Sequence, residues 1–121
     1  MKYFGTDGIR GKYGDFEVSE PFYEGLGVAC ADSLNEECGG GLVVVGCDTR
    51  ASSESLKEAF CRGLERRGIN FEDMGVLPTP ALAYAVLKRR AKLGAMITAS
   101  HNPYTDNGIK FFDSNARKVD D

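Results

Sequence analysis

The sequence predicts an α/β fold in which helices cover both faces of a sheet, and two observations support this class. Along the chain, apolar residues recur alternately at helical spacing and in short runs rich in valine and isoleucine, which is typical of alternating helices and strands. The 121 residues are 42% hydrophobic and 27% charged, the ordinary composition of one globular domain. We therefore expect a single domain over residues 1–121.

The first predicted helix covers residues 19–38. Ser19, followed by an acidic residue and a proline, is typical of a helix start, and three consecutive glycines at 39–41 end the helix. The continuous apolar run at 42–46 is rich in valine and predicts a strand that is covered on both faces. The apolar stripe expected on the helix contains Phe22, Leu26, Ala29, Cys30, Ser33 and Leu34.

The second half of the chain repeats this alternation. A helix is predicted to begin at the serine pair 52–53 and to end at Gly68, and a strand follows at 69–76. The next helix is predicted at 80–91, and its basic end at 88–90 is interpreted as solvated, since cations favour a helix C-terminus. The remaining predicted elements are a strand at 94–98, a turn at Asn107-Gly108 and a strand at 109–113.

Net charge and hydropathy together exclude two classes of partner. The net charge is −3, from 18 acidic and 15 basic residues, which does not suit a protein that binds nucleic acid by neutralising phosphates. No apolar run approaches the roughly 18 residues that span a membrane, and the first residues lack the apolar core of a signal peptide. We expect a cytoplasmic protein with no nucleic-acid or membrane partner.

The four cysteines, Cys30, Cys38, Cys47 and Cys61, form no pattern typical of a metal site. No pair is separated by two residues, and the sole histidine of the sequence is His101. Three of the four lie in apolar helical or strand patterns, so we expect free thiols in the core.

Two segments carry residues suited to chemistry on anions. In the glycine-rich segment 4–11, Arg10 lies between glycines and is well placed to meet an anion, although a plain turn fits as well. Ser100 directly follows a predicted buried strand, where ligands of α/β sheets bind. His101 is a poor base for Ser100 because adjacent side chains on extended backbone point apart, so a phosphate acceptor is favoured over a hydrolase. The alternative is a helix cap at Ser100 and a turn at Asn102-Pro103.

Two further positions support either a site or the fold. Lys110 follows an Asn-Gly pair and could exchange a proton with a sugar hydroxyl, or it could discourage aggregation on an edge strand. Asp48 and Arg50 lie between a predicted strand and a helix. We expect them to pair and hold that turn, with direct contact to an anion as the alternative.

Four segments together resemble the α-D-phosphohexomutases, in order and over nearly the whole chain. The opening KYFGTDGIRG and the segment DNGIKFF are most similar to the phosphoglucosamine mutase branch of that family. The matching segments are FGTDGIRG at 4–11, GCDTRASS at 46–53, LPTPALAYA at 77–85 and TASHNPYTDNGIKFF at 98–112.

This resemblance implies roles for named residues. Ser100 would carry a phosphate, give it to a hexosamine or hexose monophosphate, and recover the other phosphate from the bisphosphate intermediate. Mg²⁺ would be ligated in part by the phosphate on Ser100. Arg10 would stabilise charge, Lys110 would be the candidate acid or base, and His101 would shape the serine loop. The other substrate- and phosphate-loop positions would be Thr6, Asp7, Gly8, Asn102 and Asn107, with Asp48 and Arg50 as structural support.

The resemblance also implies an architecture. The family's first domain is a three-layer α/β/α sandwich with a mixed four-stranded sheet, its last strand antiparallel. Three further domains supply an Asp-rich metal loop, a specificity loop and a phosphate site, and none of these is expected in residues 1–121. The chain alone is therefore expected to be inactive, to bind Mg²⁺ weakly, to need the remaining domains in cis or in trans, and to self-associate. The alternative is a stand-alone phosphosugar-sensing or protein-interaction module derived from the mutases.

Overall fold

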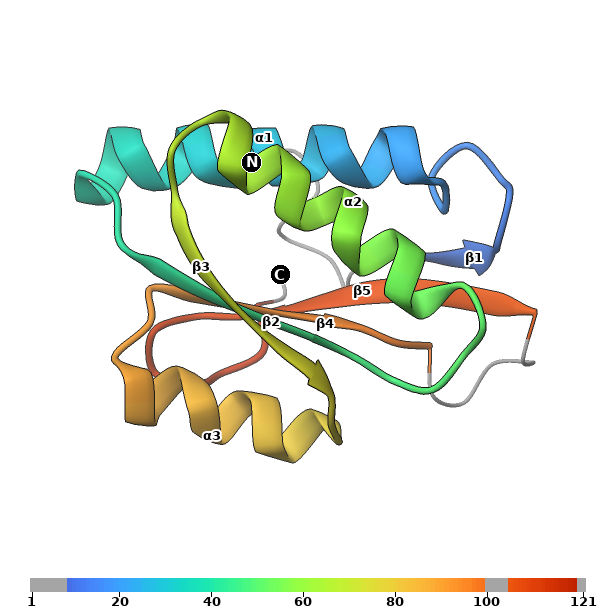
Figure 1. The fold of residues 1–121 in the computed structure, drawn as a ribbon. Coiled ribbons are helices and arrows are strands. Elements are labelled where there is room, and N and C mark those ends of the chain that lie inside the picture. The colour runs from blue at the N-terminus through green and yellow to red at the C-terminus, as the bar shows by residue number, and fades with distance from the viewer. Residues whose placement is uncertain (1–8, 100–104, 120–121) are drawn as a thin grey trace.

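A computed structural model describes residues 9–99 and 105–119, which form one mixed sheet covered by helices on both faces (Figure 1). The spatial order of the strands is β1-β5-β4-β2-β3, with β2, β3 and β4 parallel and β5 antiparallel to both of its neighbours. The predicted three-layer α/β/α class is confirmed. The strands are β1 (Ile9–Lys12), β2 (Leu42–Cys47), β3 (Asn70–Val76), β4 (Leu93–Ile97) and β5 (Asp106–Phe112).

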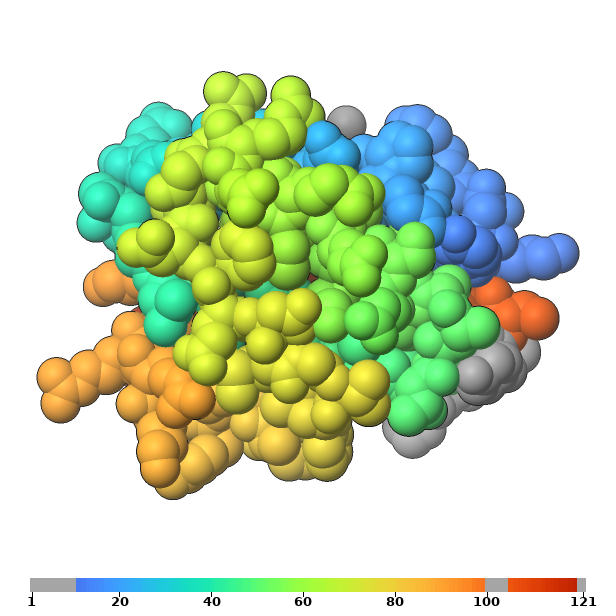
Figure 2. Space-filling view, in the orientation of Figure 1, coloured from blue at the N-terminus to red at the C-terminus, as the bar shows by residue number. Residues whose placement is uncertain are grey.

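The helices divide the hydrophobic core into two parts. Helices α1 and α2 pack together over one face of the sheet, and α3 packs on β2 and β4 from the other face (Figure 1). In the space-filling view, α2 and β3 lie between the surface of α1 and that of α3 (Figure 2). The three helices are α1 (Glu20–Cys38), α2 (Ser53–Arg66) and α3 (Thr79–Arg89). No helix in the described ranges is long and apolar enough to cross a membrane.

Two sequence predictions about the sheet are wrong. The sheet has five strands rather than four, because β1 pairs with β5 although it is short and contains Gly11. Asn107 and Gly108 do not form a turn. They lie inside β5, where they pair with β1 at Gly11 and Arg10, and the hydrogen bonds of this ladder outweigh the local turn preference of an Asn-Gly pair.

Helices α1 and α2 approach each other through two glycines. A Cβ atom built on Gly27 would lie 2.1 Å from the carbonyl oxygen of Phe60, and one built on Gly63 would lie 2.1 Å from that of Glu24. Only glycine fits at such a crossing, so these two positions set the distance between the helices.

The cysteines behave as the sequence predicts. Cys30, Cys47 and Cys61 are buried, Cys38 is exposed, and all four are free thiols. Burial raises the pKa of Cys61 to about 12, so its thiol stays protonated and unreactive.

Candidate functional site

One edge of the sheet gathers the polar residues that sequence reasoning singled out. Asp48 follows the end of β2, Thr98 follows the end of β4, and Asn107 lies near the start of β5. The backbone N–H of Asp48 donates to Ile97 across the parallel pair, and that of Thr98 donates to Gly108 across the antiparallel pair. The carboxyl ends of the parallel strands β2 and β4 and the beginning of β5, the antiparallel neighbour of β4, therefore meet here, where ligands of open α/β sheets bind.

The Asp48 carboxylate is the centre of a hydrogen-bond network. It accepts hydrogen bonds from Ser53 Oγ at 2.5 Å, from Thr98 Oγ1 at 2.8 Å and from the backbone N–H of Arg50 at 3.0 Å. The Arg50 guanidinium completes the set as an ion pair, so the expected pairing of Asp48 with Arg50 is present. Four donors on one carboxylate fix its orientation and its charge.

The electrostatics of Asp48 follow from this network. Burial on its own would raise the pKa of the Asp48 carboxyl. Hydrogen bonds from Ser53, from the Arg50 backbone, from Thr98 and from the Arg50 side chain outweigh burial and hold this pKa below its usual range. The group is therefore ionised at neutral pH.

Arg50 extends the network to the residue directly before Ser100. Its Nη2 donates to the carbonyl oxygen of Ala99 at 2.5 Å, and Ala99 is fully buried. Thr98, also buried, is tied to Asp48 at the same time. Both residues that lead into Ser100 are thus anchored to the loop between β2 and α2.

Asn107 ties β5 to the same loop. Its Nδ2 donates to Ser52 Oγ and Ser53 Oγ, both at 2.8 Å, and its Oδ1 accepts from the backbone of Gly108 at 2.9 Å. Asn107 and Ser53 are both fully buried, so the network replaces the water that their polar atoms lose. The beginning of β5, which leads toward Lys110, is therefore held at a fixed position relative to Asp48.

Lys110 is half-buried on β5 opposite Met96 of β4. Its neighbours Ile109 and Phe111 face the core beneath α1 and α2, so Lys110 points to the face that carries α3. The edge-strand interpretation of Lys110 is wrong, because β5 lies between β1 and β4. The backbone of Arg10 on β1 pairs with Gly108, two residues before Lys110 along β5, which brings these two candidate residues onto adjacent strands.

Several predicted site residues lie outside the described residues. They are Thr6, Asp7, Gly8, Ser100, His101 and Asn102, and the side chain of Arg10 is also outside the description. The structure therefore describes the framework that leads into the serine segment. The roles of the residues outside the description stay predictions.

The described residues do not fit a magnesium site. Within 9–99 and 105–119, no group of three or more His, Cys, Asp or Glu side chains could hold a metal ion. Asp48, which lies at this edge, already accepts hydrogen bonds from Ser53, Thr98 and Arg50. The described residues alone therefore do not offer the several oxygen ligands that Mg²⁺ needs.

Sequence reasoning missed three members of the network as site residues. Ser52 and Ser53 were expected to act only as the start of a helix, and Thr98 as the end of a strand. Their hydroxyls instead bind Asp48 or Asn107. The available signal was their position, since hydroxyl residues directly beyond a buried strand or before a helix lie at the ligand-binding edge of such sheets.

Comparison with known proteins gives a consistent result over the whole chain. The sequence profile of the family described as "Phosphoglucomutase/phosphomannomutase, alpha/beta/alpha domain I" matches residues 1–121. Phosphoglucosamine mutase of Francisella tularensis subsp. novicida (strain U112) is 48% identical over 120 residues, and that of Francisella philomiragia is 47% identical. Each alignment covers 99% of this chain and 27% of the relative, so the chain spans about a quarter of the length of these curated relatives.

Solved structures give the same result for the fold. A protein from Thermus thermophilus assigned as a phosphomannomutase superposes with a TM-score of 0.87 at 39% identity, over 96% of this chain and 26% of that one. A phosphoglucomutase/phosphomannomutase family protein from Burkholderia thailandensis superposes with a TM-score of 0.81 at 28% identity, over 96% and 27% of the two chains.

Proposed function

Since the chain belongs to the phosphoglucomutase/phosphomannomutase family and corresponds to its domain I, we propose that it is the phosphoserine-bearing domain of a phosphosugar mutase. The reaction would interconvert the 6-phosphate and the 1-phosphate of a hexosamine or hexose through a bisphosphate intermediate. A hexosamine is favoured because the curated relatives that are 47–48% identical are named phosphoglucosamine mutase. These relatives are isomerases, and this chain would supply one part of such an enzyme.

In the proposed reaction, Ser100 carries the phosphoryl group. The bond between phosphorus and Ser100 Oγ breaks as phosphorus bonds to a sugar hydroxyl oxygen, and the hydroxyl proton leaves to a base, for which Lys110 is the candidate. The bisphosphate then turns round and returns its other phosphoryl group to Ser100, with the proton moving back. Arg10 stabilises the charge of the transferring group.

The observation that supports this proposal best is the anchoring of the two residues before Ser100. Thr98 is bound to Asp48, and Ala99 is bound to Arg50, so the backbone enters the serine segment from a fixed direction. Phosphoryl transfer depends almost entirely on the positions of the reacting groups and on the charges around them. A backbone that is held in place directly before Ser100 therefore favours this reaction.

Magnesium belongs to the proposal only in the longer enzyme. The phosphate on Ser100 would provide one ligand, and carboxylates outside the described residues would provide the others. When bound, Mg²⁺ would spread the negative charge of the transferring group. The remaining mutase domains, in cis or in trans, would also complete the sugar site.

The test measures conversion of glucosamine 6-phosphate to the 1-phosphate by the protein in the form that its source produces. Ser100→Ala should reduce conversion to the background rate. Ser114→Ala, which alters an exposed serine in the loop after β5, should leave it unchanged. The 121-residue chain alone should show no conversion, and conversion by Ser100→Ala would overturn the proposal.

The expected self-association also has a structural basis. Apolar side chains remain exposed on α3 and at the end of β3, where Tyr84 is 63%, Leu87 52% and Val76 56% exposed. We propose that the chain by itself forms dimers or larger species through such surfaces, which the remaining domains would otherwise cover. Light scattering across the micromolar range tests this, and a monomer at all concentrations would contradict it.

A further inference from the structure

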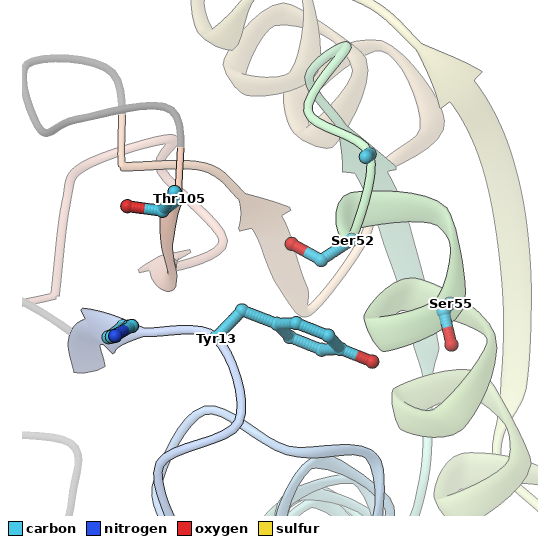
Figure 3. A pocket seen from close by; sticks show the side chains of 6 residues that line it. Tyr13, Ser52, Ser55 and Thr105 are labelled. Carbon is cyan, nitrogen blue, oxygen red and sulfur yellow. The ribbon is translucent and has the colours of Figure 1, made fainter.

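A pocket of about 420 Å³ lies between the end of β1, the start of β5 and the start of α2 (Figure 3). Its volume falls in the range of roughly 300–1,000 Å³ that is usual for small-molecule sites. No lining residue is among those to which the family resemblance assigns a role, so the proposed mutase chemistry leaves the pocket unused. The lining residues are Lys12, Tyr13, Ala51, Ser52, Ser55 and Thr105.

The walls of this pocket are held in place by hydrogen bonds. Tyr13 Oη donates to Glu20 Oε2 at 2.5 Å, and Ser55 Oγ donates to the same oxygen at 2.6 Å. The backbone N–H of Tyr13 donates to the carbonyl oxygen of Thr105 at 3.1 Å. The Tyr13 ring therefore reaches from β1 toward α2 and is fixed at both ends (Figure 3). A rigid wall reduces the conformational entropy that the protein must lose when a ligand binds.

The lining combines three kinds of group. The Tyr13 ring provides a flat apolar surface, Ser52, Ser55 and Thr105 provide hydroxyls, and Lys12 provides an exposed positive charge. Ser52 Oγ accepts from Asn107 Nδ2, so its own proton can be donated to a ligand. A sugar ring offers a matching apolar face and several hydroxyls, and a phosphate substituent matches the ammonium group.

We propose that this pocket binds a sugar monophosphate, with the sugar ring on Tyr13 and the phosphate at Lys12. The choice of a sugar phosphate rests in part on the proposed function, whereas the pocket itself does not. Ser52 lines the pocket and also binds Asn107, which in turn binds Ser53 of the hydrogen-bond network around Asp48. A ligand on Ser52 therefore contacts this network from the side of the pocket. The site is thus a second sugar-phosphate site beside the candidate catalytic edge.

Nuclear magnetic resonance of the ¹⁵N-labelled protein, titrated with glucosamine 6-phosphate, tests this proposal. Saturable shifts are expected at the amides of the lining residues. Binding should weaken about tenfold in Tyr13→Ala, about fivefold in Lys12→Gln, and less than about twofold in Tyr13→Phe, which keeps the ring. The matched control is Lys88→Gln, an exposed lysine on α3 across the sheet, which should bind like the unaltered protein.

Three results would overturn the proposal. They are the absence of saturable shifts at the lining amides, binding of inorganic phosphate as tight as that of glucosamine 6-phosphate, and equal binding by Tyr13→Ala. The same titration of Ser100→Ala separates this site from the proposed function. If the protein in the form that its source produces lacked mutase activity while the lining amides still shifted, the proposed function alone would be removed. If that form had mutase activity but showed no such shifts, this inference alone would be removed.

Discussion

Replacing Gly63 by alanine tests how closely α1 and α2 must pack. In a helix interior, alanine is favoured over glycine by about 1 kcal/mol, so local propensity predicts a more stable protein. The packing predicts the opposite. The new methyl group would lie 2.1 Å from the carbonyl oxygen of Glu24, 2.7 Å from the backbone nitrogen of Val28 and 2.8 Å from Cα of Gly27.

The size of the effect follows from these distances. Ordinary contact begins at 3.4 Å, so α1 and α2 must separate by about 1.3 Å at the Glu24 carbonyl. All three obstructing atoms are backbone, and therefore no side chain can rotate away. Overpacking of a core costs about 1–3 kcal/mol, and a backbone obstacle places Gly63→Ala near the upper end, at about 3 kcal/mol. In a domain of this size, the melting temperature should fall by roughly 10 °C.

Gly25→Ala is the matched control within the same helix pair. Gly25 is exposed on α1, and a Cβ atom built there meets nothing within 4 Å. This variant should gain about 1 kcal/mol from helix propensity alone. Urea unfolding followed by circular dichroism gives both free energies of unfolding. If Gly63→Ala proved as stable as Gly25→Ala, the glycine contact would not set the helix spacing, and the reasoning would be refuted.

Three further predictions concern polar groups. Asp48→Asn should lower the free energy of unfolding by about 1–3 kcal/mol, since all four donors lose a charged acceptor, as measured by urea unfolding at pH 7. Because the pKa of Asp48 is lower in the folded state, its contribution is complete above an unfolded pKa of about 3.9 and is lost as the pH falls through the folded value. Unfolding measured from pH 5 down to pH 2 should therefore show a steeper loss of stability in the unaltered protein than in Asp48→Asn, and equal slopes would contradict this. Tyr23→Phe should leave the melting temperature unchanged or raise it, because the fully buried hydroxyl has no hydrogen-bond partner among the described residues.

The sequence allowed most of the fold to be predicted because the apolar periods of helices and strands differ. It could not predict β1, since four residues that include a glycine carry no period of their own. The orientation of α1 was also only partly predicted. Phe22 and Ala29 were expected on its buried stripe and are only partly buried, although Phe22 does pack against the core. The helix turns Tyr23, Gly27 and Ala31 fully inward, because the contact of its glycine with α2 decides which side faces the core.

The charged pair of the candidate site was predicted from the sequence, but the residues that hold this pair and its strands in place were not. The pairing of Asp48 with Arg50 followed from two opposite charges separated by a single residue in a short turn. The role of Asn107 did not, because its partners Ser53 and Ser52, at the start of α2 and directly before it, lie 54 and 55 residues earlier in the chain. The burial of Lys57 could not be predicted from the sequence either. It is 3% exposed and pairs with Asp73 at 2.9 Å, a burial that the helical pattern of charges did not indicate.

The most direct test of the central proposal is the mass of the tryptic peptide 93–110, which contains Ser100. The protein, in the form that its source produces, is incubated with glucosamine 1,6-bisphosphate and then digested. The account predicts a gain of about 80 Da, the mass that one phosphoryl group adds to a hydroxyl, located on Ser100 by fragmentation and absent from Ser100→Ala. A peptide that gains no phosphate, or that carries it on Thr98 or Thr105, would contradict the account.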